Sequence, residues 1–257
     1  MTDAPETVAV LIPVFNDSGL LTSTLRSLRD QGVPIVTVVV DDGSTPPLAC
    51  DADSTGVEIV ILRHDANRGI AYIARLDNGD RCAPGRLVSQ RDYLDAHRDV
   101  YLVGSAVEWR DDNGRVRFVR ELPTAHDDIV RMMHHTTALI HPAVMFRTSV
   151  IDTVGVYSTA YPAAEDYELF WRIARRHRVA NLAETLLVTR FDPQGLSMRR
   201  RRQQLRSTLR IQLAYFRPGT WESWFGVAKT LGRFAIPYSW IVAIKTMRSR
   251  RSDLVTA

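Results

Sequence analysis

The chain has 257 residues, of which 45% are hydrophobic and 24% are charged, and this composition excludes a disordered or low-complexity protein. Its two cysteines, Cys50 and Cys82, are too few for a disulfide framework, and no apolar run reaches the ~18 residues of a membrane-spanning helix. The net charge of +4 is uneven, because residues 199–202 are four consecutive arginines. A chain of this length holds one large α/β domain or a domain with a tail.

Three apolar runs near the N-terminus, at 8–14, 35–40 and 57–62, predict strands that are buried on both faces. A helix is expected between the first two, with Ser18 as its cap and Gly32 at its end. Such a unit makes the strands parallel, and ligands of parallel sheets bind beyond the carboxyl ends of the strands. The loops expected at that edge are PVFND (13–17), DDGST (41–45) and DNGD (77–80).

The DNGD loop places Asp77 and Asp80 on either side of Asn78-Gly79. Asn-Gly is a strong hairpin signal, but the residues from Pro84 onward have helical spacing. The two carboxylates are therefore expected on a strand-to-helix loop at the binding edge, where a divalent metal and a phosphate could meet. A surface turn with two solvated acids is the alternative.

Two patterns in the middle of the chain have simpler interpretations. Strand-like segments on both sides of residues 112–114 predict a β-hairpin, in which Asp111 is only a turn residue. The histidines His134, His135 and His141 do not match a strong metal-ligand spacing.

Glu165 and Asp166 come at the start of a predicted helix. Acidic residues in a first turn favour the helix dipole and need no further role. Two adjacent acids could equally provide a general base, and the positive end of the helix is expected to keep the Asp166 carboxylate charged.

Six motifs follow one another between about Val8 and Ser197: IPVFN, VVVDDGST, NRG (67–69), RLDNGD with a following Pro and GRL, HPAVMFR (141–147) and EDYELFWR (165–172). In this order they resemble the motifs of the family 2 glycosyltransferases, which are inverting enzymes of the GT-A fold. The resemblance implies an α/β fold with a Rossmann-like, mostly parallel sheet flanked by helices. It implies a glycosyltransferase domain at 1–197, followed at 198–257 by an amphipathic, basic, helical tail.

The resemblance also implies roles for single residues. Asp166 would take the proton from the acceptor hydroxyl, with Glu165 beside it. Asp77 and Asp80 would hold Mg²⁺ or Mn²⁺, and Asp192, which stands where the family usually has a histidine, could supply a further oxygen ligand. The nucleotide would be bound by Pro13, Phe15, Asn16, Asp41, Asp42, Asn67 and Arg68.

Two departures from the family pattern keep an alternative open. Gly79 occupies a position where the family usually has an acid. Only residues 63–71 separate Leu62 from Tyr72, which is short for a crossover that contains a helix. Both departures favour a catalytically impaired relative that binds a sugar nucleotide or a membrane surface, whereas the intact Glu165-Asp166 pair favours an active enzyme.

Aromatic and basic residues are mixed in the tail at 198–257. This pattern fits an amphipathic helix on a membrane surface, or a helical hairpin packed on the domain. The expected partners are a nucleotide-sugar donor, a glycan or lipid-linked acceptor of cell-envelope polysaccharide biosynthesis, and the membrane surface. No nucleic-acid recognition motif accompanies the arginines. The expected location is cytoplasmic and peripheral, at the inner face of the cell membrane.

Overall fold

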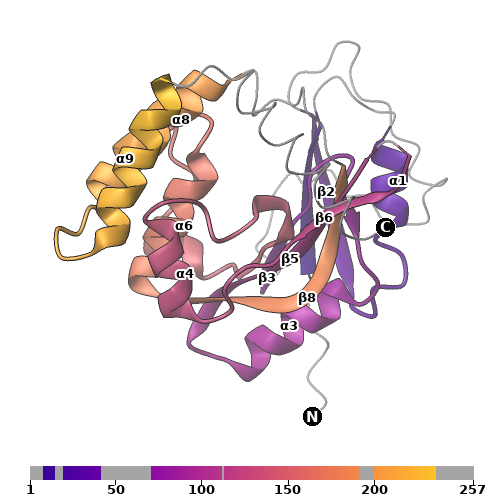
Figure 1. The fold of residues 1–257 in the computed structure, drawn as a ribbon. Coiled ribbons are helices and arrows are strands. Elements are labelled where there is room, and N and C mark those ends of the chain that lie inside the picture. Colours follow the sequence, from indigo (N-terminus) through magenta and orange to yellow (C-terminus); the bar gives the residue numbers. More distant parts are fainter. Residues whose placement is uncertain (1–7, 15–19, 42–70, 112, 191–199, 236–257) are drawn as a thin grey trace, which may run out of the picture.

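The computed structural model describes residues 8–14, 20–41, 71–111, 113–190 and 200–235 (Figure 1). Six candidate site residues lie outside these ranges: Phe15, Asn16, Asp42, Asn67, Arg68 and Asp192. Pro13 and Asp41 are described by their backbone alone. The predicted strand at 57–62 and nearly all of the short crossover at 63–71 also fall outside the described residues.

The described strands form one mixed, eight-stranded sheet. Its order is β2 (Ile35–Asp41), β1 (Val8–Val14), β3 (Tyr72–Arg75), β7 (Met145–Arg147), β5 (Val100–Arg110), β8 (Arg178–Arg190) and β4 (Arg81–Cys82), and β6 (Val116–Arg120) pairs with β5 off this path. Strand β1 is parallel to β2 and β3, and β5 is parallel to β8, whereas β7, β4 and β6 are antiparallel to their neighbours. The α/β prediction is confirmed, and the expectation of a mostly parallel sheet is corrected to a mixed one.

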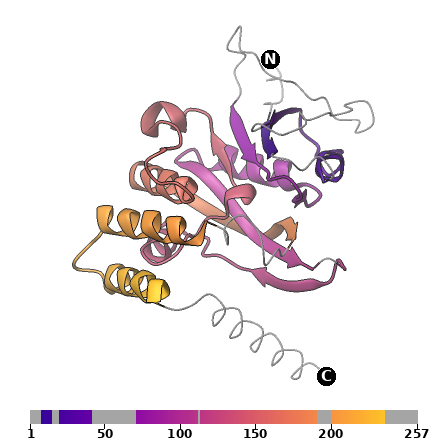
Figure 2. The same ribbon diagram turned by 90° about the horizontal axis from the view of Figure 1, so that it is seen from above.

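Helices lie along the sheet and at its end (Figures 1 and 2). They are α1 (Leu21–Arg26), α3 (Arg86–Ala96), α4 (His126–Met133), α5 (Val150–Val154), α6 (Glu165–Arg176), α8 (Arg201–Ala214) and α9 (Trp221–Ala235), with a 3₁₀ turn at His141–Ala143. Helix α3 begins at Arg86, after Gly85, so Pro84 precedes the helix.

The sheet separates two hydrophobic cores. Because successive side chains of a strand point to opposite faces, neighbouring residues enter different cores. Three pairs of neighbours divide between the two cores in this way: Leu102 and Val103, Phe146 and Met145, and Val179 and Ala180. One core contains residues of α1 and α3, and the other contains residues of α4, α5 and α6. Helix α6 is thereby fixed against the sheet through its apolar face.

The predicted hairpin between β5 and β6 is confirmed. The carboxylate Oδ1 of Asp111 accepts hydrogen bonds of 3.0 Å from the backbone N–H groups of both Asn113 and Arg115. Gly114 has a φ of +76°, which suits a turn glycine. Asp111 is therefore a structural turn residue, as its sequence context predicts.

Helices α8 and α9 form a hairpin beside α4 and α6 (Figures 1 and 2). Ile211 joins the second core, and Ser207 Oγ donates a 2.8 Å hydrogen bond to the Pro162 carbonyl. Leu213, on α8, is 56% exposed. Within the described part of the chain, no helix has the length and apolarity that crossing a membrane requires.

Gly226 allows α9 to pack closely against the end of α4. A Cβ atom at Gly226 would lie 2.0 Å from the His134 carbonyl oxygen and 3.0 Å from the His135 Cα atom. Gly232, in the same helix, would place a Cβ in open space. The hairpin is therefore positioned by a contact between backbones that only glycine permits.

We predict that Gly226→Ala lowers the free energy of unfolding by ~1–3 kcal/mol, because the added methyl must displace backbone atoms. Gly232→Ala is the matched control, and it should raise stability by ~0.5–1 kcal/mol through helix propensity alone. Urea unfolding of both variants measures the difference. Equal stability of the two variants would contradict this docking of the hairpin.

Candidate active site

A tight turn at residues 77–80 carries two carboxylates at the end of β3. The Asp80 N–H donates a 3.1 Å hydrogen bond to the Asp77 carbonyl, and Gly79 has a φ of +91°. A Cβ at Gly79 would lie 3.1 Å from Leu20 Cδ1. Glycine at this position therefore has a local conformational reason, because a side chain would strain the turn.

The turn is held from two sides. From α1, Thr24 Oγ1 accepts the Gly79 N–H at 3.1 Å, and Ser27 Oγ accepts the Cys82 N–H at 3.3 Å. From the other side, the short strand β4 pairs antiparallel with β8 and not with β3. Asn78-Gly79 is thus no hairpin, and the predicted strand-to-helix loop is confirmed with a two-residue strand inserted before α3.

Two buried arginines lie beside this turn. Arg86 is fully buried, and its guanidinium donates to Gln90 Oε1 at 3.0 Å and to the Arg75 carbonyl at 2.8 Å. Arg75 is 6% exposed, and its Nη2 lies 2.7 Å from Asp77 Oδ1. Neither arginine was assigned a role from the sequence, although the polar pair Arg86 and Gln90 at i, i+4 within a buried helix was a usable signal.

Burial raises the pKa values of both carboxylates in the turn. The pKa of Asp80, which is 6% exposed, rises to about 7, and the charge of Asp77 adds to this rise. Desolvation also raises the pKa of Asp77, while Arg75 and Arg86 oppose the shift. The Asp77 side chain is 41% exposed, so it remains accessible to solvent. A cation bound to it would stabilise the charged forms of both carboxylates.

Helix α6 carries the second acidic pair at its start. Ala163, just before the helix, has a left-handed φ of +62°, and its N–H donates a 3.0 Å hydrogen bond to Glu165 Oε1. Asp166 Oδ1 accepts the Tyr167 N–H at 2.7 Å. Strained backbone of this kind is characteristic of functional sites. Glu165 thus supports the loop, while Asp166 lies at the start of the helix.

The pKa of Asp166 is set by opposing influences. Burial raises its pKa, and the charges of Glu165 and Asp77 raise it further, although backbone N–H groups at the helix start oppose the shift. Desolvation is therefore a larger influence on this pKa than the hydrogen bonds at the helix start. The effect of Asp77, the smallest of these influences, indicates that the two acidic motifs, far apart in sequence, lie close enough for their charges to interact.

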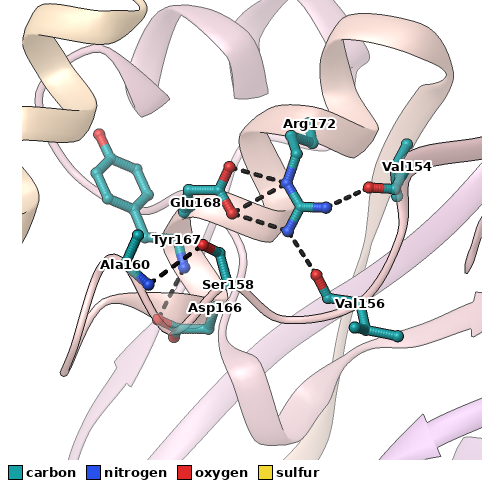
Figure 3. Close-up of polar contacts among 8 residues, drawn as sticks. All are labelled: Val154, Val156, Ser158, Ala160, Asp166, Tyr167, Glu168 and Arg172. Carbon is teal, nitrogen blue, oxygen red and sulfur yellow. Dashed lines mark hydrogen bonds and ion pairs between the residues drawn. The ribbon is translucent and has the colours of Figure 1, made fainter.

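The loop between α5 and α6 lies beside Asp166 (Figure 3). Arg172 on α6 forms a bidentate ion pair with Glu168, with distances of 2.8–3.0 Å, and donates to the carbonyls of Val154 and Val156. Ser158 Oγ accepts the Ala160 N–H at 3.3 Å. These contacts fix the loop that carries Tyr157.

Tyr157 and His141 form a neutral pair next to the carboxylates. The Tyr157 hydroxyl lies 2.8 Å from His141 Nε2. Burial lowers the pKa of His141 to about 3, with a smaller effect from Arg75, and burial raises the pKa of Tyr157 to about 12. Although 37% of Tyr157 is exposed, its hydroxyl is the end that contacts His141. Both side chains are uncharged at neutral pH and can act as hydrogen-bonding groups.

The three histidines do not form a metal site. His134 Nδ1 lies 3.0 Å from Ser223 Oγ, whereas His141 contacts Tyr157. Across the described ranges, no group of three or more His, Cys, Asp or Glu side chains could hold a metal ion. The residues that could bind a cation are Asp77 and Asp80, a donor set of one or two carboxylates that suits Mg²⁺ or Mn²⁺ shared with substrate phosphates.

Comparison with known proteins gives one family and several structural neighbours. Residues 9–155 match the family model described as glycosyl transferase family 2. The chain is 32% identical over 140 residues to the amylovoran biosynthesis glycosyltransferase AmsE of Erwinia amylovora, an alignment that covers 54% of this chain and 52% of AmsE. The chain thus spans about half of that relative's length.

Two solved structures have the same fold. TarS residues 1–349 of S. aureus, in complex with UDP, match with a TM-score of 0.58 and 17% identity over 91% of this chain and 73% of TarS. The mannosyltransferase PcManGT of Pyrobaculum calidifontis, in complex with GDP-Man and Mn²⁺, matches with a TM-score of 0.55 and 15% identity over 96% and 82% of the two chains. These likenesses confirm the expected GT-A fold. With the family model matching more than half of its residues, the chain belongs to glycosyl transferase family 2.

Proposed function

We propose that this protein transfers a sugar from a nucleotide-diphosphate sugar to a hydroxyl group of a glycan or lipid-linked acceptor, with inversion at the anomeric carbon. The observation that supports this proposal is that the charge of Asp77 reaches Asp166, as expected for a candidate base and a candidate ligand of the diphosphate-bound metal that act in one site. The solved relatives in complex with UDP and with GDP-Man support a nucleotide-sugar donor.

Asp166 is the proposed general base. Its raised pKa makes the carboxylate a better proton acceptor than a solvated aspartate, because a base is most effective when its pKa is near the working pH. The acceptor oxygen would attack the anomeric carbon from the face opposite the leaving diphosphate, so one displacement suffices and no enzyme nucleophile is needed. Glu165, hydrogen-bonded to the Ala163 N–H, positions the loop before the base.

Asp77 and Asp80 are the proposed ligands of Mg²⁺ or Mn²⁺, a proposal that the GDP-Man and Mn²⁺ complex of PcManGT supports. When bound, the cation supplies charge stabilisation for the departing diphosphate. Arg75 keeps Asp77 in place through their 2.7 Å ion pair, and Thr24 and Ser27 hold the turn. Asp192 remains a candidate for a further ligand, outside the described residues.

We predict that Asp166→Asn reduces turnover by ~10²-fold or more while donor binding is retained, because the amide keeps the size of the side chain but cannot accept the proton. Glu165→Gln, the neighbouring control, should cost less. Initial rates and calorimetric titration with the donor measure the two effects. A larger loss in the Glu165 variant would move the role of base to Glu165.

A second prediction concerns the metal. Asp77→Asn should weaken Mn²⁺-dependent donor binding by at least ~10-fold, because it removes a charged oxygen ligand. Asp111→Asn is the control, since Asp111 lies in a hairpin turn. Calorimetric titration of the donor with and without Mn²⁺ measures the change. Equal losses in both variants would refute the proposed metal site. If the wild-type protein binds the donor but shows no turnover, the alternative of a catalytically impaired relative is favoured.

We further propose that α9 lies on a membrane surface, which would bring the site to a lipid-linked acceptor at the inner face of the cell membrane. Large apolar side chains on α9 are exposed, by 66% at Trp221 and by 51% at Leu231. The others are Trp224, Phe225 and Phe234, and together they cover an arc of roughly 180° at 100° per residue. Lys229 and Arg233 lie on the same helix. Aromatic and basic residues in this arrangement are typical of interfacial helices.

We predict that Trp221→Ser combined with Leu231→Ser weakens binding to anionic vesicles by at least ~10-fold, because each exposed side chain would lose its burial in the interface. The control is Val116→Ser combined with Val119→Ser, since these two residues of β6 are also exposed and apolar. Sedimentation with vesicles measures the bound fraction. Equal sedimentation of the two variants would refute a specific role of α9.

A further inference from the structure

A cavity of about 510 Å³ lies between α4, α6 and the turn that joins α8 to α9. Its lining includes three arginines, Arg131, Arg175 and Arg217, against one carboxylate, Asp127. A smaller cavity of about 120 Å³ shares Arg175 and Arg217 with it. The lining therefore carries an excess of positive charge in a space large enough for a small molecule.

Two of these arginines have no counter-ion among the residues that the structure describes. Arg131 is paired with Asp128 at 2.6 Å, on the exposed side of α4. Arg175 lies over the Tyr215 ring at 5.7 Å. The described hydrogen bonds of Arg217 are all made by its backbone, whose N–H donates to Ser223 Oγ and whose carbonyl accepts from Thr220. In the described ranges, neither Arg175 nor Arg217 has an ion-pair partner. Guanidinium groups with free donors are the usual ligands of phosphate groups.

The rest of the cavity wall suits an anion with an attached organic group. Trp171 lines both cavities and is stacked on Tyr215, with ring centroids 4.8 Å apart. His134, also in the wall, has its pKa lowered by burial and by Arg217, so the uncharged ring adds a hydrogen-bonding group. The site thus combines charged donors with an aromatic surface.

This cavity is separate from the proposed active site. Arg175 is nine residues after Asp166 on α6, which corresponds to roughly 14 Å along the helix. We propose that the cavity binds a phosphate-type anion, with the guanidinium groups of Arg175 and Arg217 as its donors. The same chemistry is presented by free phosphate compounds and by phosphate groups of lipids. The inference stands on the cavity itself and does not require the proposed transfer reaction.

Calorimetric titration with inorganic pyrophosphate, at low salt and with EDTA present, tests the site in the full-length protein. Arg175→Gln combined with Arg217→Gln should weaken binding by at least ~10-fold, because two charged donors are removed. Arg176→Gln combined with Arg206→Gln is the control, with the same change of charge at exposed positions outside the cavity. Any pyrophosphate that binds at the proposed donor site would bind equally to both double variants, so a difference between them reports on the cavity.

The control variant should bind like the wild type. Equal affinity of the two double variants, or no binding by the wild type, would overturn the proposal. If the double variant does not fold, Arg217→Gln alone provides the test, since no described hydrogen bond involves its side chain.

A vesicle experiment separates the two sources of the anion. Phosphatidylcholine vesicles with and without phosphatidylglycerol are sedimented with the cavity variant and the control variant. A selective loss of binding to anionic vesicles in the cavity variant assigns the site to lipid phosphate. Equal vesicle binding, together with lost pyrophosphate binding, assigns it to a soluble phosphate compound.

Discussion

The site depends on one buried cation. Arg86 is fully buried, and none of its described hydrogen bonds is to a carboxylate. It joins α3 to β3 and β4 through Gln90, the Arg75 carbonyl and Cys82 Sγ. Gln90 in turn donates to the carbonyls of Val103 and Ala143. A buried charge is costly unless opposite charges lie near it. Asp77 and Asp80 meet that need. Arg86 in return opposes the rise that burial causes in the pKa of both carboxylates. The acidic turn and the arginine thus stabilise each other.

Helix α6 connects the parts of the molecule that carry the proposals. Its first turn holds Glu165 and Asp166. Its middle holds Arg172, which donates hydrogen bonds to the loop that carries Tyr157, and its last turns line the cavity that contains Arg175 and Arg217. Its apolar face lies in the second core, so all three features are attached to a rigid element. Rigid support of this kind is what positions a base to within hydrogen-bonding distance of a substrate.

The electrostatic state of the site follows from burial more than from any single partner. Desolvation is the largest influence on the pKa values of Asp77, Asp80 and Asp166, and in each case it outweighs the hydrogen bonds and arginines that favour the charged form. His141 responds in the opposite direction, because burial disfavours its charged form as well. The site therefore combines acids of raised proton affinity with a neutral Tyr157–His141 pair.

The sequence by itself determined the α/β class, the parallel pairing of the first strands, the hairpin at Asp111 and the loop position of Asp77 and Asp80. These features depend on local patterns: apolar runs, turn residues and helical spacing act over a few neighbouring residues. Only the tertiary structure decided that the sheet is mixed, that burial raises the pKa of Asp166, and that Arg75, Arg86 and Tyr157 belong to the site. It also placed Arg175 and Arg217 together in the lining of a cavity, where neither has an ion-pair partner among the described residues. Desolvation and contacts between distant segments arise only when the chain is packed, and no local pattern encodes them.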